Sequence, residues 1–124
     1  MASETAAKKY TGGCHCKRFR YKYTHSAFEN GECDVGNCNC SVCNMNALLF
    51  IYVPETSFEL TSGSVEELTR CTFNTKSYYH HFCPTCGTEI IGKTGGKVGI
   101  NVRMVDGIRL EKLKLKPFDG AALL

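Results

Sequence analysis

The sequence lacks long apolar runs, an export signal and clustered charge. No apolar stretch approaches about 20 residues, so a transmembrane helix is not expected. Residues 1–9 are small and polar, without the apolar centre of a secretory signal peptide. The net charge is only +3, the pI is ≈ 8.4, and the basic residues are spread along the chain. Neither a membrane nor a nucleic acid is therefore expected as a partner.

The length and the hydrophobic pattern indicate one β-rich domain. The chain has 124 residues, 43% of them hydrophobic, and no long polar tract. Residues 1–9 are expected to form a flexible lead, and residues 10–124 a single domain. Residues 65–69 are expected to form a helical turn. Short segments with the pattern of β-strands lie at residues 18–23, 48–53, 57–60, 77–82, 88–92, 98–102 and 110–115.

Cysteine is abundant, with nine residues. A secreted disulfide scaffold usually has an even number of cysteines and an export signal, and this chain shows neither. The close Cys-x-Cys and Cys-x-x-Cys spacings instead favour thiolates that bind a metal. A reducing compartment is therefore expected, the cytoplasm or alternatively the nucleus.

Four cysteines form an outer set of metal-binding motifs. Cys14 and Cys16 lie near the start of the chain, and Cys83 and Cys86 belong to a Cys-Pro-Thr-Cys-Gly knuckle near the end. Four thiolates complete the tetrahedral shell of a structural zinc. Such a site would join the first strand to a late hairpin and stabilise the fold. Buried thiols without a metal are the alternative for Cys14 and Cys16.

Three cysteines form an inner set. Cys38, Cys40 and Cys43 place three thiols within six positions, on a loop expected to run into a helical turn. Three protein ligands leave one coordination position open, which is typical of catalytic zinc. An unmetallated redox cluster is one alternative. A fourth protein ligand that closes the site is the other, with these candidates: Cys33, Cys71, His80 and His81.

The remaining cysteines and histidines have simpler interpretations. Cys33 and Cys71 lie outside both spacings and are expected to be small buried side chains. His15, between two ligands, is expected to be exposed or close to the metal site. His80 and His81 are expected on opposite faces of a strand. A surface position is the simpler interpretation for each, although one could face a pocket.

These motifs resemble the glutathione-dependent formaldehyde-activating enzyme family, which includes the centromere protein V domain. The resemblance runs from about Tyr10 to Phe118, nearly the whole chain. The resemblance is specific because three spaced cysteine motifs occur in the same order as in the family. The segments with the resemblance are residues 12–16, 38–43, 81–88 and 100–107.

The resemblance implies a fold, two metal sites and an activity. The fold would be Mss4-like, with stacked antiparallel sheets stapled by zinc, and each chain would hold two zinc ions. The activity would be that of a carbon–sulfur lyase that joins glutathione to formaldehyde as S-(hydroxymethyl)glutathione. The structural zinc would bind Cys14, Cys16, Cys83 and Cys86. The catalytic zinc would bind Cys38, Cys40 and Cys43.

One segment departs from the family pattern. Many members place basic residues directly after the third cysteine of the inner motif, where this chain has Asn44, Met45 and Asn46. A cationic contact for the carboxylates of glutathione is therefore missing there. The candidates to replace it are Arg18, Lys76 and Arg103. The candidates for a general acid or base, from sequence proximity alone, are Tyr78, His80 and His81.

Two functions of different classes follow. The first is a zinc-dependent enzyme that acts on a thiol adduct, with glutathione as the default thiol substrate. The second is a non-catalytic zinc-binding module for a protein, microtubule or chromatin partner. The open position of the inner site favours the enzyme.

Overall fold

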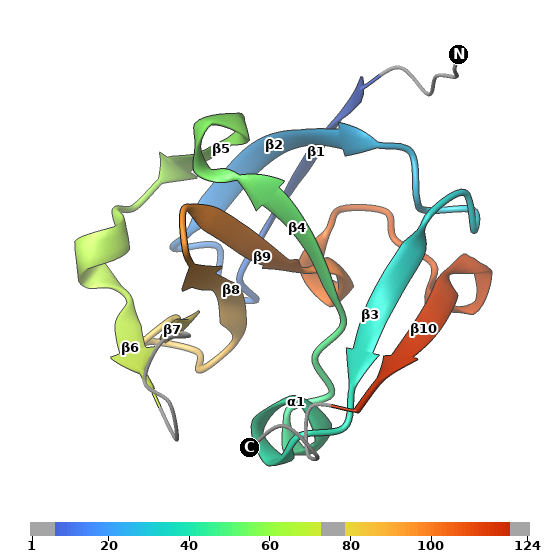
Figure 1. Cartoon of the computed structure of the whole chain (residues 1–124). Helices are drawn as coiled ribbons and strands as arrows, with labels where there is room; N and C mark the ends of the chain where they lie inside the picture. The colour runs from blue at the N-terminus through green and yellow to red at the C-terminus, as the bar shows by residue number, and fades with distance from the viewer. Residues whose placement is uncertain (1–6, 73–78, 120–124) are drawn as a thin grey trace.

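The computed structural model describes residues 7–72 and 79–119, which form two β-sheets (Figure 1). The smaller sheet has three strands, in the order β1 (Ala7–Gly13), β2 (Arg20–Ser26) and β5 (Phe58–Ser62). The larger has seven, in the order β10 (Lys114–Phe118), β3 (Asp34–Cys38), β4 (Phe50–Pro54), β9 (Lys97–Asn101), β8 (Glu89–Thr94), β7 (Tyr79–Phe82) and β6 (Thr69–Cys71). The expected mainly β fold is confirmed.

Helical structure in the described residues is short. It consists of the α-helix α1 (Ser41–Met45) and the 3-10 turns η1 (Glu55–Ser57), η2 (Val65–Glu67), η3 (Val102–Met104) and η4 (Leu110–Lys112). The turn η2 confirms the helical turn expected within residues 65–69. Within residues 7–72 and 79–119, no helix has the length and apolar character that crossing a membrane requires.

The first hairpin confirms the predicted alternation and corrects its boundaries. Phe19, Tyr21 and Tyr23 are all buried, as the alternation of basic and aromatic residues predicted. The strand begins at Arg20 rather than at residue 18. Strand β1 begins at Ala7 and pairs with β2, so residues 7–9 are paired in a sheet rather than part of a flexible lead. The small and polar side chains of residues 7–9 suggested flexibility, but pairing with β2 gives the backbone of these residues hydrogen-bond partners.

The late segments form the expected hairpin around the cysteine knuckle. β7 and β8 pair antiparallel, and residues 77–78 of the predicted first strand lie outside the described residues. The register shifts between His81, which pairs with Ile91, and Phe82, which pairs with Glu89. Such a bulge changes which side chains share a face of the sheet.

The C-terminal segment differs from the prediction. Residues 110–115 alternate like a strand, but the turn η4 takes up Leu110–Lys112 and the strand β10 begins only at Lys114. β10 pairs with β3 in parallel, in contrast to the antiparallel pairing of the other strands. Every residue of β10 is exposed, because an edge strand has only one neighbour and nothing in the described chain covers its faces.

The two sheets meet across a common core of aromatic and aliphatic side chains. A bridge between Gly12 and Val105 also joins β1 to the segment after β9. A Cβ atom on Gly12 would lie 2.4 Å from the carbonyl oxygen of Met104, so a larger residue would force this contact apart. A second, smaller core cluster contains Cys40, Cys43, Leu48 and Phe50. The inner cysteines are thus packed against their own apolar group.

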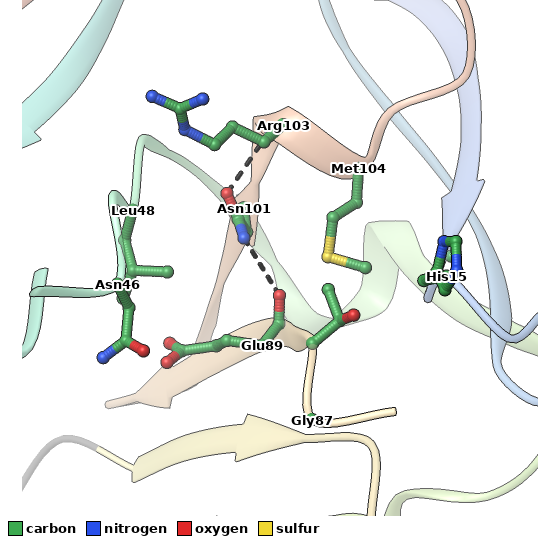
Figure 2. Close-up of a pocket in the computed structure, with 10 residues that line it drawn as sticks. His15, Asn46, Leu48, Gly87, Glu89, Asn101, Arg103 and Met104 are labelled. Carbon is green, nitrogen blue, oxygen red and sulfur yellow. Dashed lines mark hydrogen bonds between the residues drawn. The ribbon is translucent and has the colours of Figure 1, made fainter. Parts of the chain in front are cut away.

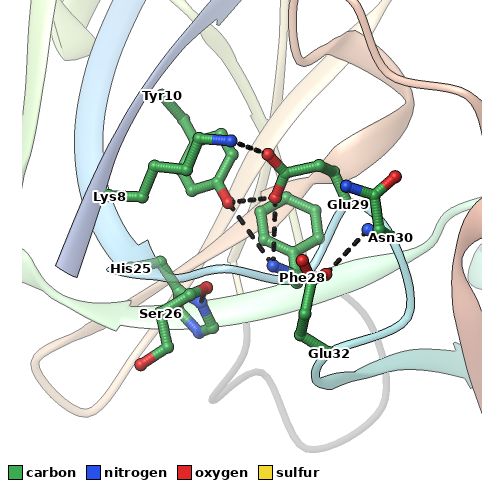
Figure 3. Close-up of polar contacts among 8 residues, drawn as sticks. All are labelled: Lys8, Tyr10, His25, Ser26, Phe28, Glu29, Asn30 and Glu32. Atoms are coloured by element: carbon green, nitrogen blue, oxygen red, sulfur yellow. Dashed lines mark hydrogen bonds and ion pairs between the residues drawn. The ribbon is translucent and has the colours of Figure 1, made fainter. Parts of the chain in front are cut away.

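A carboxylate anchors the loop after β2 to strand β1 (Figure 3). Glu29 accepts hydrogen bonds from the ammonium of Lys8, the hydroxyl of Tyr10 and, at 3.2 Å, the backbone N–H of Phe28. Burial alone would raise the pKa of Glu29, but the hydrogen bonds from Lys8 and Tyr10 outweigh it and lower the pKa to about 2. The ionised carboxylate therefore stabilises the fold.

We expect Glu29→Gln to lower the free energy of unfolding by about 1–2 kcal/mol at pH 6, and this difference to vanish towards pH 2. The folded-state pKa is below the ordinary value of 4.5. The stabilisation is therefore fully present above pH 4.5 and is lost as pH falls through about 2. Urea unfolding of the wild-type protein and Glu29→Gln from pH 6 to pH 2 measures this difference. Effects of acid on the cysteines are common to the two proteins and cancel in the comparison. A difference that stays constant over this range would contradict the assignment.

Candidate metal centres and the pocket between them

The outer cysteines converge on one point. Cys14 and Cys16 lie in the turn between β1 and β2, and Cys83 and Cys86 lie in the turn between β7 and β8. The Sγ atoms of Cys14 and Cys16 are 3.6 Å apart, as are those of Cys16 and Cys83. All four sulfurs lie within 4.8 Å of one another. The cluster thus joins the three-stranded sheet to the seven-stranded sheet.

Backbone N–H groups surround the buried sulfurs of this cluster. The N–H of Phe19 donates to Cys14 Sγ at 3.4 Å, and the N–H groups of Thr85 and Cys86 donate to Cys83 Sγ at 3.3 and 3.5 Å. Gly87, the glycine that ends the knuckle motif, has φ +78°, a conformation that glycine adopts without strain. These donors favour the negatively charged thiolate, which is the form that binds a metal.

The inner cysteines also converge. Cys38 ends strand β3, Cys40 precedes helix α1, and Cys43 lies within it, which confirms the expected loop into a helical turn. Their sulfurs lie within 4.8 Å of one another. Among residues 7–72 and 79–119, no other cysteine, histidine or carboxylate joins this group. Of the four candidates for a fourth ligand, all of which the structure describes, none lies within this group.

The thiols within each cluster differ in acidity. Burial alone would raise the pKa of Cys86, but hydrogen bonds, chiefly with Thr88, lower it to about 5. In the inner cluster, burial is likewise outweighed at Cys40, where hydrogen bonds involving Cys43 lower the pKa. The pKa of Cys43 is raised, first by burial and then by its contacts with Cys40. Each cluster thus contains at least one thiol whose pKa is lowered, and sulfur donors gathered this closely suit zinc.

The other cysteines and histidines partly depart from expectation. Cys33 is partly buried against the core, whereas Cys71 is exposed at the end of β6. His15 is exposed, as expected. His80 and His81 are both buried, which corrects the interpretation of surface histidines. β7 pairs with β6 and β8 at its two edges, and the ring of His80 lies 6.5 Å from that of Phe50, so packing from elsewhere in the fold covers these side chains.

A pocket of about 430 Å³ lies between the segments that carry the two clusters, and Figure 2 shows the residues that line it. On one side it is lined by neighbours in sequence of the outer cysteines, and on the other by residues that follow the inner cysteines. The complete lining is Gly13, His15, Asn46, Leu48, Gly87, Thr88, Glu89, Asn101, Arg103 and Met104. Leu48 both lines the pocket and packs against the inner cysteines.

Arg103 gives this pocket a cation. Its Nε donates to the carbonyl oxygen of Ala47 at 2.6 Å, in the segment just after α1. Asn101 accepts the backbone N–H of Arg103 at 3.3 Å and donates to the carbonyl oxygen of Glu89 at 3.0 Å. Of the three cations considered from the sequence, the structure describes Arg18 and Arg103, and Arg103 is the one that contacts the segment after α1. Arg18 contacts Thr85 near the outer cluster, and Lys76 lies outside the described residues.

Glu89 is a site residue that was not predicted from the sequence. Its carboxylate Oε2 lies 2.6 Å from His80 Nδ1, and the two side chains are only 7% and 5% exposed. Glu89 also lines the pocket. A signal was present, because Glu89 is a lone acid at the start of the apolar run Ile90-Ile91, where a buried carboxylate needs a partner. Tyr78, another candidate acid or base, lies outside the described residues.

Comparison with known proteins agrees with this geometry. Residues 9–118 match the family described as glutathione-dependent formaldehyde-activating enzyme. A crystal structure of a Rhodobacter sphaeroides protein is similar, with a TM-score of 0.70 and 25% sequence identity, over 86% of this chain and 99% of that one. The matched segment contains both cysteine clusters and the pocket between them. The protein therefore belongs to the glutathione-dependent formaldehyde-activating enzyme family.

Proposed function

We propose that the protein is a zinc-dependent carbon–sulfur lyase that makes and breaks the bond between a thiol sulfur and an electrophilic carbon. Glutathione is the default thiol and formaldehyde the carbon partner, with S-(hydroxymethyl)glutathione as the adduct. The observation that supports this most directly is the inner cluster, with three sulfurs within 4.8 Å and no fourth protein donor among the described residues. Three protein ligands are typical of zinc sites that accept a substrate.

The inner cysteines provide the donors that zinc prefers. A zinc ion held there would keep a substrate sulfur in its thiolate form at neutral pH, as nucleophile or as leaving group. Leu48 and Phe50 pack against Cys40 and Cys43 and shield them on the core side. With water excluded on this side, charges at the cluster interact more strongly than they would in bulk solvent.

Arg103 is suited to hold the carboxylate of a peptide thiol such as glutathione. Its contact with Ala47 fixes the guanidinium beside the segment that follows Cys43. A planar guanidinium can bind a carboxylate through two parallel hydrogen bonds. Arg103 would thereby replace the basic residues that many family members have at the position of Asn44, Met45 and Asn46. The substrate sulfur would then lie towards the inner cluster.

The outer cluster is assigned a structural role. Its four thiolates would complete the shell of a zinc ion and leave no position for a substrate. The cluster joins turns from the two sheets, so a metal there would hold the pocket walls in place. The proposed enzyme thus uses two zinc ions per chain, one for the fold and one for the reaction.

The test is the exchange rate among glutathione, formaldehyde and their adduct, measured by NMR at equilibrium. Formaldehyde and thiols combine without a catalyst, so the amount of product is uninformative and the rate must exceed the background. We expect wild-type protein to accelerate exchange and Cys40→Ser to show only the background rate. Cys71→Ser is the matched control, because Cys71 is exposed and outside both clusters. It is expected to keep the wild-type rate.

The same assay separates the enzyme from the non-catalytic module. If zinc-loaded wild-type protein leaves exchange at the background rate over a panel of thiol adducts, the lyase proposal fails. The binding module would then be the better interpretation of the two clusters.

A further inference from the structure

Glu89 and His80 form a buried polar pair that neither cysteine cluster explains. The contact between Glu89 Oε2 and His80 Nδ1 is 2.6 Å, and both side chains are at least nine-tenths buried. Burying a carboxylate is unfavourable unless it is paired and hydrogen-bonded. His80 supplies that partner, with Nδ1–H donating to the carboxylate. The hydrogen bond from His80 thus stabilises the Glu89 carboxylate at a buried position where an apolar residue would otherwise be expected.

A β-bulge brings the two side chains together. His80 and Phe82 share a face of β7, because side chains alternate along a strand. In a regular hairpin, Phe82 would pair with Ile90, and Glu89 would fall on the opposite face. The observed register pairs Phe82 with Glu89 instead. The shift therefore places Glu89 on the same face as His80.

The pair lies between the pocket and the inner cluster. Glu89 lines the pocket, and Figure 2 shows its carboxylate extending towards the side formed by Asn46 and Leu48. The ring of His80 is 6.5 Å from that of Phe50, centroid to centroid. Phe50 and Leu48 both pack with Cys40 and Cys43. Arg103 and Glu89 line the same pocket, so a substrate held there by Arg103 would share the pocket with this carboxylate.

We propose that Glu89, held by His80, is the general base and acid that exchanges a proton with the hydroxyl oxygen of the thiol adduct. This inference rests on the proposed lyase function. Glu89 would contact the substrate and is therefore proposed as a catalytic residue. His80 is proposed as a positioning residue that acts through Glu89.

The proton transfer balances in both directions. In cleavage, the O–H proton of the hydroxymethyl group passes to the Glu89 carboxylate, and the O–H electron pair forms the C=O bond of formaldehyde. The electron pair of the C–S bond leaves with sulfur, which becomes the thiolate. In synthesis, the thiolate attacks the carbonyl carbon while protonated Glu89 returns its proton to oxygen. General acid–base catalysis of this kind typically contributes about 10²–10⁴-fold in rate.

A competing role for Glu89 is to bind the ammonium group of glutathione. Two observations favour proton transfer. The Glu89 side chain is 7% exposed, so an ammonium group bound there would have to give up most of its hydration. One oxygen of Glu89 already accepts a hydrogen bond from the buried His80. This bond holds the carboxylate in place, and the other oxygen can exchange a proton with the substrate. The two roles differ in kinetics, since an ammonium contact affects binding and a proton transfer affects turnover.

The test is adduct exchange by Glu89→Gln, with the rate measured against substrate concentration. Glutamine keeps the size and one acceptor oxygen but cannot take up the proton. We expect kcat to fall about 100-fold or more with KM within about threefold of wild type. Metal content is expected to stay unchanged. Glu59→Gln, an exposed carboxylate on β5, is the matched control and is expected to match wild type.

Each of the other possible results either supports or overturns the proposed role of Glu89. A raised KM with unchanged kcat would assign Glu89 to ammonium binding, and unchanged kinetics would remove it from the site, so either result overturns the proposal. If Glu89→Gln does not fold, Glu89→Asp keeps the carboxylate but withdraws it by one methylene. A fall in its kcat at constant KM would support the proposal, and a wild-type kcat would overturn it. Wild-type exchange at the background rate would instead refute the lyase function itself.

Discussion

Cys83→Ser is expected to prevent folding or to lower the melting temperature by roughly 15 °C, which corresponds to a loss of about 4 kcal/mol. Cys83 is completely buried, and its sulfur accepts the N–H groups of Thr85 and Cys86. It is one of four donors that join turns from different sheets, and Cys16 and Cys83 are 67 positions apart. Zinc binding by such a site is folding free energy, because the unfolded chain has no preformed site.

The matched variant is Cys40→Ser. All three inner cysteines come from one short segment, so a metal there constrains the chain only locally. We expect the melting temperature of Cys40→Ser to stay within a few degrees of wild type, while one equivalent of zinc is lost. Thermal unfolding by circular dichroism and elemental analysis measure the two effects. Equal losses of stability in both variants would show that the clusters do not have distinct roles.

Metal removal is expected to occur in two separate steps. Freshly purified protein should contain between one and two equivalents of zinc, and a chelator should remove the inner ion first. An inner ion would have three protein thiolates and a position at which a chelator can enter, whereas an outer ion would have four thiolates. Loss of the inner ion should leave the circular dichroism spectrum unchanged. Loss of the outer ion should unfold the chain, because it separates the two sheets.

The measurement is a chelator titration that follows released zinc and far-ultraviolet circular dichroism together. Cys40→Ser provides the control, since it should show only the second step. Release of all zinc in one step together with unfolding would contradict the assignment of separate sites. Folded protein that contains no zinc after fresh purification would contradict both metal sites.

Arg103 and Glu89 illustrate what the pocket adds to the cysteine motifs. Arg103 follows strand β9, and Glu89 begins strand β8. Asn101 connects them through hydrogen bonds to the backbone of each. The pocket thus presents a guanidinium and a carboxylate on walls that are linked by one amide side chain. This arrangement suits a substrate with separated carboxylate and hydroxyl groups.

The sequence determined the features that depend on short spacing. Cys38, Cys40 and Cys43 can converge because a loop that enters a helical turn brings neighbouring residues together whatever the rest of the fold does. The knuckle of Cys83 and Cys86 depends likewise on a tight turn, and Gly87 takes the positive φ that this turn needs. These local rules were enough to predict the inner cluster and each half of the outer one, together with their loop settings, while the family came from the resemblance of the motifs.

Only the tertiary structure decided which distant residues share the pocket. Regular alternation along the hairpin would have separated Glu89 from His80, and the bulge that unites them is a matter of strand register rather than of residue type. Burial of His80 and His81 likewise depends on what packs against β7, such as Phe50 beside His80. Arg103 reaches the inner site through a contact with Ala47, 56 positions away. Such contacts depend on how whole strands pack, and no local pattern specifies that packing.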